Sequence, residues 1–351
     1  MIEDLAKLYG IADSRRSNMV ILERAVLHIL DFAGGDPVLS SQELALEDGV
    51  REFLVRHVEK TIHSQDAKSG KFYENSEFNA MLQGCLEHKY SFVEFSRQVA
   101  AMLYKALAPC QDVQNTDLFV CQMNVDDVPH VALLKCINHQ GYVHQVNVAE
   151  DGKVATEVMN SSGLLPGNSQ RMDEFAYINL KSGKTLIKAK KYSLNGNNVF
   201  VLPELLLECN QAPSPRETIK EINKVVQKVS EAYCQDQVET AAAVKNYIAE
   251  NLPPDGQLDP QQVGEAVFQD NPAMQADYRQ EMENAGFREP IVVDKEATLK
   301  KMRKHRLATD TGIELVIPTE FFENTEFVEF YKDEDGFMSI TLKNIQNIVN
   351  K

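Results

Sequence analysis

Two lysine-rich segments are the clearest candidates for a binding site in this chain of 351 residues. The first lies in EFAYINLKSGKTLIKAKKY, where Ser182–Gly183 is typical of a two-residue turn between β-strands. Pairing Lys181 with Lys184 puts Ala, Ile, Leu and Thr residues on one side, which should face the core. The other side then holds cations and aromatic rings without an acid: Phe175, Tyr177, Asn179, Lys181, Lys184, Leu186, Lys188 and Lys190, with Lys191 adjacent.

This second side is a candidate nucleic-acid-binding surface. Lysine ammoniums contact phosphate oxygens, and Tyr177 is able to stack on a base or to hydrogen-bond. Lysine lacks the planar fork with which arginine reads a base edge, so binding would not depend on base sequence. The alternative is a solvated hairpin whose lysines protect an edge strand from pairing.

The second basic segment is KKMRKHR, and the next acid after it is Asp310. Asp294 is placed to cap a short helix that leads into the segment. The alternative to nucleic-acid contact is a solvated helix end, where cations favour the helix dipole. The candidate residues are Lys300, Lys301, Arg303, Lys304, His305 and Arg306, with the histidine as a neighbour rather than a contact. A third row, Lys220, Lys224 and Lys228, is typical of an ordinary exposed helix face.

Catalytic motifs are missing from the sequence, which contains no GxxxxGK[ST], GxSxG or HExxH and no GxGxxG after a strand. Asp126, Asp127 and Lys135 superficially resemble a nuclease's acids and lysine, and His130, His139 and His144 lie nearby. The spacing that a nuclease needs on the following strand is absent. The six cysteines are scattered and fit reduced thiols rather than a zinc site. We therefore expect no enzymatic activity, no cofactor and no bound metal, with a metal-dependent nuclease as a remote alternative.

Local signals indicate the elements that position these residues. A helical stripe begins at Val50, and Ser40 with Glu43 predicts a capping box before it. Ser91 and Glu94 predict a second capping box at the start of a long helix, whereas NMVILERAVLHILD fits either a helix or a strand. Short β-prone runs follow over 117–207: DLFVCQM, VALLKCIN, YVHQVNV, EFAYINLK, TLIKAK and NVFVLPELL.

The segment CNQAPSPR, with two prolines, indicates a linker at 209–215. Beyond it, Ser214–Pro215, Asp259–Pro260 and Asn271–Pro272 each predict a helix start, which gives a helical section over about 215–285. From 288 onward, EPIVV and two glycine-ended hairpins predict a β module. We expect an α+β protein of two domains: residues 1–210, helices with an antiparallel sheet, and residues 211–351, a helical bundle closed by β-hairpins over 288–351.

The net charge of −16 is unusual for a DNA-binding protein. Residues 211–294 contain 7 basic and 15 acidic side chains, a balance of 7 − 15 = −8. This acidity favours an alternative function, an adaptor that docks on the basic face of a DNA-processing protein. The sequence has no apolar run long enough for a membrane span and no signal peptide, so we expect a cytoplasmic protein without membrane contact.

Several motifs together resemble the bacterial nucleoid-associated protein family of the YejK/NdpA type. They run in the family's order over nearly the whole chain: AVLHILD, LSSQELAL, FLVRHVEKTI, KSGKFY, DLFVCQM, HVALLKCINHQGYVH, EFAYINLK, YSLNGNNVFV, HRLATDTGIELVIPTEFF and VEFYKDEDGFMSITLKNI. The helical stretch 215–285 matches least specifically. The resemblance implies association with the bacterial chromosome and supplies neither a catalytic residue nor a contact residue.

From these observations we expect a non-enzymatic protein of the nucleoid that binds DNA, duplex or single-stranded, with low sequence specificity. A nucleoid protein partner would fit the adaptor alternative. A homodimer would raise avidity by doubling a modest basic patch, but the sequence leaves the oligomeric state open.

Overall fold

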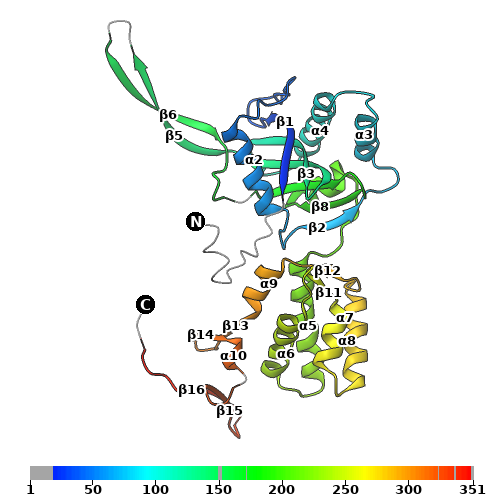
Figure 1. Cartoon of the computed structure of the whole chain (residues 1–351), viewed down its shortest axis with the longest axis vertical. Coiled ribbons are helices and arrows are strands. Elements are labelled where there is room, and N and C mark those ends of the chain that lie inside the picture. Colours follow the sequence, from blue (N-terminus) through cyan, green and yellow to red (C-terminus); the bar gives the residue numbers. More distant parts are fainter. Residues whose placement is uncertain (1–18, 149–151, 171, 323, 336, 349–351) are drawn as a thin grey trace, which may run out of the picture. The chain divides into compact units, whose positions relative to one another are not determined.

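The computed structural model describes residues 19–148, 152–170, 172–322, 324–335 and 337–348. The chain divides into two compact units on either side of Ala212 and Pro213, and each is described by itself. Helices and antiparallel strands occur in both units, so the fold is mixed α+β, as expected (Figure 1). Among the described residues, no helix is long and apolar enough to cross a membrane.

Unit 1 is built on a six-stranded antiparallel sheet with the strand order β1-β3-β4-β7-β8-β2. The strands are β1 (Val20–Leu30), β3 (Thr116–Val125), β4 (Val128–Ile137), β7 (Glu174–Asn179), β8 (Lys184–Lys188) and β2 (Lys68–Lys71). β2 is therefore an edge strand. Its partner β8 lies more than a hundred residues later in the sequence. This long-range pairing places its lysines next to those of β8.

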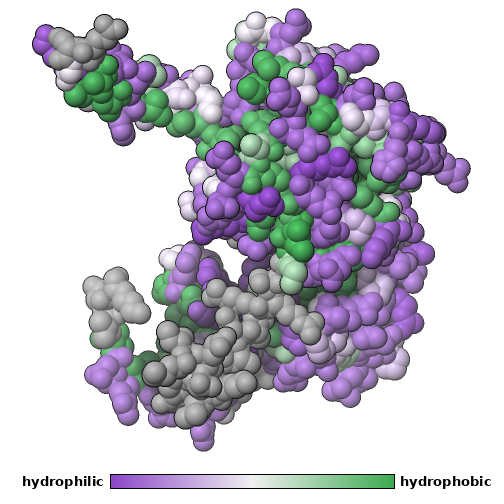
Figure 2. All heavy atoms as spheres, turned by 45° about the horizontal axis from the view of Figure 1, so that its top comes forward, coloured by the Kyte–Doolittle hydropathy of each residue, from purple (hydrophilic) through white to green (hydrophobic). Residues whose placement is uncertain are grey.

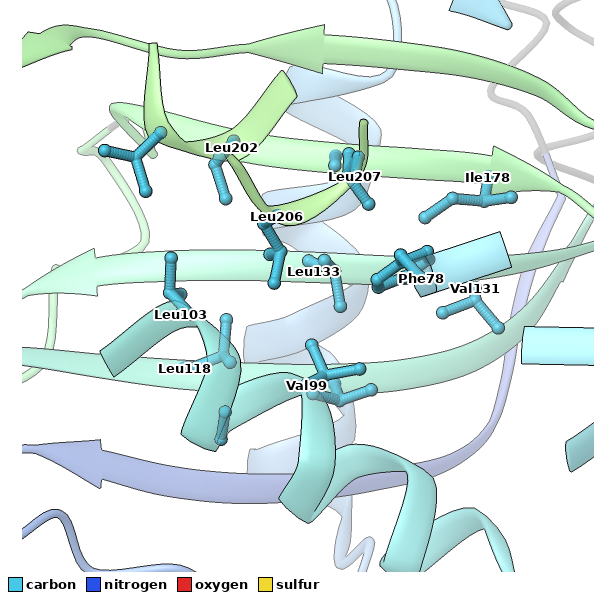
Figure 3. Packing of buried hydrophobic residues seen from close by; sticks show 14 of the residues in the cluster. Phe78, Val99, Leu103, Leu118, Val131, Leu133, Ile178, Leu202, Leu206 and Leu207 are labelled. Carbon is cyan, nitrogen blue, oxygen red and sulfur yellow. The ribbon is translucent and has the colours of Figure 1, made fainter. Parts of the chain in front are cut away.

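Both faces of this sheet are covered. One face packs against α3 (Glu77–Leu86), α4 (Phe92–Leu107) and the short π-helix η1 (Val201–Leu206). Figure 3 shows this cluster, with Leu103, Leu202 and Leu206 over Leu118 and Leu133. The other face packs against α2 (Asp48–Thr61). Strands covered on both faces read as nearly continuous apolar runs, as β3 and β4 do.

His28 shows why one predicted capping box is wrong. The ambiguous N-terminal run is the strand β1, and its buried His28 accepts a hydrogen bond from the Ser40 N–H at 3.1 Å through Nδ1. Its Nε2 then donates to Ser96 Oγ at 3.0 Å. Burial, followed by the charge of Arg97, lowers the pKa of His28 to about 4. Ser40 thus belongs to a segment tied to β1, and α2 begins only after Glu47, without a side-chain cap.

The other local signals of unit 1 are mostly confirmed. Ser91 and Glu94 form the predicted capping box of α4. The run NVFVLPELL is only partly a strand: β10 (Asn197–Phe200) pairs with β9 (Lys191–Leu194), and the chain then turns into η1. Pro203 lies in η1 and has no N–H to give to a strand ladder, which explains the early end of β10.

A separate two-stranded hairpin is inserted between β4 and β7. It consists of β5 (His139–Val148) and β6 (Val154–Leu164) and projects from the rest of unit 1 (Figure 1). β5 was predicted, whereas β6 was not among the predicted strands. The apolar side chains of this hairpin are exposed, in contrast to those of the central sheet.

Unit 2 begins with the predicted helices α5 (Pro215–Ala232), α6 (Gln237–Asn251), α7 (Pro260–Val267) and α8 (Pro272–Asn284). Each of the three proline starts is confirmed, with Ser214, Asp259 and Asn271 as N-caps. The helices share one apolar core, in which Tyr278 of α8 lies against Gly264 of α7.

The predicted β module follows the helices. Its elements are β12 (Ile291–Val292), which pairs with β11 (Gln257–Leu258), then α9 (Lys295–Met302), β13 (Lys304–Ala308), β14 (Glu314–Pro318), α10 (Thr319–Phe322), β15 (Val328–Lys332) and β16 (Met338–Leu342). Both predicted hairpins, β13–β14 and β15–β16, are present. Gly312 in the first turn has a φ of 86°, as predicted for a glycine-ended turn.

Candidate nucleic-acid interface

The hairpin β7–β8 carries the first predicted binding segment, but its register differs from the prediction. Ile187 pairs with Ala176, not with Ile178, so the register is shifted by two residues. The Asn179 side chain accepts hydrogen bonds from the N–H groups of Lys181 and Ser182, which closes a turn longer than two residues. Because side chains alternate with a period of two, a shift of two leaves each residue on its predicted side.

The prediction that the aromatic rings of this hairpin are exposed is wrong. Phe175 and Tyr177 are 0% and 2% exposed, because α2 covers the side of the sheet that was expected to face solvent. The Tyr177 hydroxyl is hydrogen-bonded to Thr61 on α2, and burial raises the pKa of Tyr177 above its ordinary value. Tyr177 is therefore a core residue, and it cannot stack on a base without disruption of this layer.

The lysines of the hairpin, by contrast, lie at the margin of the sheet. Lys181, Lys184 and Lys191 are exposed, and Lys188 and Lys190 are half-buried. Lys181 Nζ reaches the turn between β3 and β4, where it donates to the Asp127 carbonyl at 3.3 Å.

The structure adds two lysines that sequence reasoning missed. In the β2–β8 ladder Lys71 lies directly opposite Lys184, and Lys68 lies opposite Ile187. Lys68 and Lys191 also converge on the Phe200 ring, with Nζ atoms 6.0 and 5.5 Å from its centroid. We call the combined set the lysine edge: Lys68, Lys71, Lys181, Lys184, Lys188, Lys190 and Lys191. The KSGK motif shows these two lysines in the sequence, but only the pairing of β2 with β8 shows that they lie beside the lysines of the hairpin.

The charge of the lysine edge is largely unneutralised. Within the described ranges, no ion pair joins Lys71, Lys184 or Lys191 to a carboxylate. Like charges directly opposite each other, such as Lys71 and Lys184, destabilise a ladder slightly. An anion bound between them would relieve this repulsion.

A buried polar cluster holds β9 behind the lysine edge. Lys135 Nζ lies 2.5 Å from Glu174 Oε2 and donates to the Tyr192 hydroxyl at 2.8 Å. The Tyr192 hydroxyl in turn donates to the same carboxylate, and the Lys190 N–H donates to its other oxygen. Burial lowers the pKa of Lys135, and the Glu174 charge partly offsets this shift. Burial and the Glu174 charge both raise the pKa of Tyr192. The cluster fixes the backbone from which Lys190 and Lys191 project.

The second predicted segment is divided between the end of α9 and β13. Asp294 caps α9 as expected, by accepting a hydrogen bond from the Ala297 N–H. His305 points inward and stacks on Phe322 with ring centroids 3.8 Å apart; burial, then Lys245, lowers its pKa to about 4. The remaining cations are all exposed: Lys300, Lys301, Arg303, Lys304 and Arg306.

The residues considered for a nuclease do not come together. Asp126 and Asp127 form the β3–β4 turn with φ angles of 48° and 61°, while Lys135 lies at the other end of β4. Lys135 is eight residue steps along the strand from Asp127, a span of about 26 Å. His139 belongs to the projecting hairpin, and His130 Nδ1 is hydrogen-bonded to the Val128 carbonyl. In the part of the chain that the structure describes, no group of three or more metal-ligating side chains is present.

The fold and the site define a class of protein: a mixed α+β chain with an exposed cationic edge on a sheet whose two faces are covered. The chain belongs to the family described as nucleoid-associated protein YejK, whose model matches residues 26–349. This membership supports a nucleoid-associated role. A comparison with curated proteins found no match.

Proposed function

We propose that this protein binds DNA with low sequence specificity through its lysine edge, and that it acts at the nucleoid by binding rather than by catalysis. The observation that carries the proposal is the β2–β8 pairing, which sets Lys71 beside Lys184 and brings Lys68 to the same margin as Lys191. The family membership supports the nucleoid-associated role independently of these residues.

The chemistry of the lysine edge fits phosphates better than bases. Its cations are lysines, which act as point charges and lack the bidentate fork used in base readout. Two aromatic rings beside the lysine edge, Phe200 and Tyr192, already lie under lysine ammoniums, so they are not open stacking platforms. Binding should therefore depend on salt concentration far more than on DNA sequence.

The first experiment is a titration of fluorescent duplex DNA at several salt concentrations. The test variant is Lys71→Gln/Lys184→Gln/Lys191→Gln, which removes three charges from the edge without introducing repulsion. The control, Lys220→Gln/Lys224→Gln/Lys228→Gln, removes three charges from the exposed row on α5 in the other unit. Each lost phosphate contact changes the slope of log affinity against log salt by about 0.9, so the edge variant should lose about 2.7 from the slope.

The proposal requires the two variants to differ. The control variant should keep the slope and affinity of the wild type. Equal effects of both variants, or no binding by the wild type at low salt, would overturn the assignment to the lysine edge. Single-stranded DNA and RNA of equal length, titrated in parallel, identify the preferred nucleic acid.

The second basic segment is proposed as an additional contact. Lys300, Lys301, Lys304 and Arg306 are exposed, and none of them forms an ion pair with a carboxylate among the described residues. A Lys300→Gln/Lys301→Gln/Lys304→Gln variant should lower the salt slope further if this segment contacts phosphates. An unchanged slope would restrict binding to unit 1.

The acidity of unit 2 favours a second candidate function, the adaptor. Exposed acids are distributed over the helices α5–α8 and the loops between them, including Asp236, Glu239, Asp255, Asp270 and Asp277. A cationic protein surface is the complementary partner for such a bundle. Affinity capture from nuclease-treated lysate should still recover a DNA-binding protein if the adaptor function holds, and loss of every partner after nuclease treatment would count against it.

A further inference from the structure

Three ammonium groups of the lysine edge lie over two aromatic rings. The Nζ atoms of Lys68 and Lys191 are 6.0 and 5.5 Å from the centroid of the Phe200 ring. Lys190 Nζ is 4.8 Å from the centroid of the Tyr192 ring. The negative face of an aromatic ring attracts an ammonium within about 6 Å. These rings therefore restrict lysine side chains that are otherwise among the most flexible in proteins.

The Phe200 ring joins lysines of two different sheets. Lys68 belongs to β2, the edge strand of the six-stranded sheet, whereas Lys191 belongs to the β9–β10 ribbon. Both Nζ atoms lie within 6.0 Å of one point, so two like charges are held near each other. The attraction of the ring for each ammonium offsets part of their mutual repulsion.

The backbone of Phe200 is itself fixed. Phe200 is the last residue of β10, where it pairs with Lys191, and its N–H donates to Glu204 Oε2 at 3.2 Å. The next residue, Val201, begins η1 and is buried in the core of unit 1. The half-buried Phe200 side chain therefore projects from a rigid junction between a strand and a helix.

The projecting β5–β6 hairpin does not extend this cationic surface. Lys153 and Glu157 are the only charged residues in the described part of β5, β6 and their connection. Figure 2 shows hydrophobic side chains along this hairpin. Contacts with phosphates need several cations, so the order of the lysine edge matters more than the reach of the hairpin.

We propose that Phe200 is a positioning residue of the DNA-binding surface, whose ring holds the ammonium groups of Lys68 and Lys191 in place for the phosphate backbone. A lysine that is immobilised only on binding lowers the affinity, because its side-chain entropy is lost at that moment. An ammonium has three N–H donors, so a ring on one side leaves donors for a phosphate on the other. This inference rests on the proposed function of the lysine edge: the lysines supply the charge, and Phe200 supplies their order.

The first test is a titration of fluorescent duplex DNA with the full chain at several salt concentrations. The variant Phe200→Leu removes the ring and keeps every lysine. Its affinity should fall about 5- to 20-fold, because two ammonium groups lose their support. Its slope of log affinity against log salt should equal that of the wild type, because the number of phosphate contacts is unchanged.

Two further variants separate positioning from general packing. Phe200→Tyr keeps an aromatic face, so it should bind DNA like the wild type. Phe32→Leu makes the same substitution at another half-buried ring, which stacks on Tyr104 with centroids 4.9 Å apart. Phe32 follows β1, at the edge of the sheet opposite β2, so this control should also keep the affinity of the wild type.

The second test examines the free protein by NMR, with ¹³C-labelled lysine in the full chain. Protons above an aromatic ring are shifted upfield by its ring current. Upfield-shifted lysine ε-methylene signals should be present in the wild type, Phe200→Tyr and Phe32→Leu. In Phe200→Leu the signals of Lys68 and Lys191 should lose this shift, whereas that of Lys190 over Tyr192 should keep it.

The outcomes distinguish this inference from the proposed function. No DNA binding by the wild type would overturn the function proposed for the lysine edge, and the role of Phe200 with it. DNA binding by the wild type with equal or higher affinity for Phe200→Leu would overturn the positioning role alone. The same conclusion would follow from an equal loss in Phe32→Leu, a changed salt slope, or lysine signals that do not respond to loss of the Phe200 ring.

Discussion

The buried cluster of Lys135, Glu174 and Tyr192 leads to a prediction whose size follows from its geometry. Lys135 and Glu174 are 3% and 1% exposed, so neither charge has water to replace its partner. Replacing Lys135 by Met leaves the Glu174 carboxylate buried with the Tyr192 hydroxyl and one backbone N–H as donors. Removal of one member of a buried pair costs about 3–5 kcal/mol, which is a large part of the stability of a domain.

The double variant Lys135→Met/Glu174→Leu should cost less than the sum of the two single variants. No charge remains buried, and the main penalty is the unsatisfied Tyr192 hydroxyl, about 1–3 kcal/mol. Adding Tyr192→Phe should recover most of this loss, because an apolar cluster of similar volume replaces the ion pair. The cluster would then be a device that fixes the position of β9 rather than a source of net stability.

The assay is urea unfolding, monitored by hydrogen exchange of the β4 and β7 amides. Exchange is needed because the chain has two units that can unfold separately, and it assigns the transition to unit 1. Single variants that cost less than about 1 kcal/mol would refute this reasoning. So would a double variant whose cost equals the sum of the singles, because independent sites add.

Three further predictions test other parts of the fold. Burial holds the pKa of His28 at about 4, below its ordinary 6.5, so only the unfolded chain gains a proton as the pH falls from 6.5 to 4. The free energy of unfolding of unit 1 should therefore fall by up to about 3 kcal/mol over that window. Urea midpoints at pH 7 and pH 5 measure this loss, and a His28→Gln variant should not show it. Gly264→Ala should destabilise unit 2 by more than about 2 kcal/mol in thermal unfolding, because the new Cβ would lie 2.0 Å from the Tyr278 ring; an unchanged midpoint would contradict the packing of α7 on α8. Ser91→Ala should cost about 1 kcal/mol by loss of the α4 cap, measured by urea unfolding, and a neutral result would remove the capping box as a stabilising feature.

The sequence by itself determined the features whose causes are local. Helix starts at Ser91, Ser214 and Asp259 follow from side chains that satisfy the first backbone N–H groups, three residues or fewer away. The hairpins of unit 2 follow from strand alternation and turn glycines. The family could be identified as well, because its motifs are ordered along the chain.

Only the tertiary structure decided which side of the β7–β8 hairpin meets solvent. Alternation in a strand separates two faces but does not say which one is covered, and here α2 covers the face that holds Tyr177. Sequence reasoning assumed one covered face, so it placed that ring on the surface.

The composition of the lysine edge was also beyond the reach of the sequence. Lys71 and Lys184 are neighbours because β2 pairs with β8 across more than a hundred residues, and no local pattern encodes that register. The Ser40 signal failed for a similar reason: the Ser40 N–H bonds to His28 on another element, and the helix begins later. Local chemistry therefore determined the elements of this protein, whereas long-range pairing and the covering of both sheet faces decided which of their side chains are available for binding.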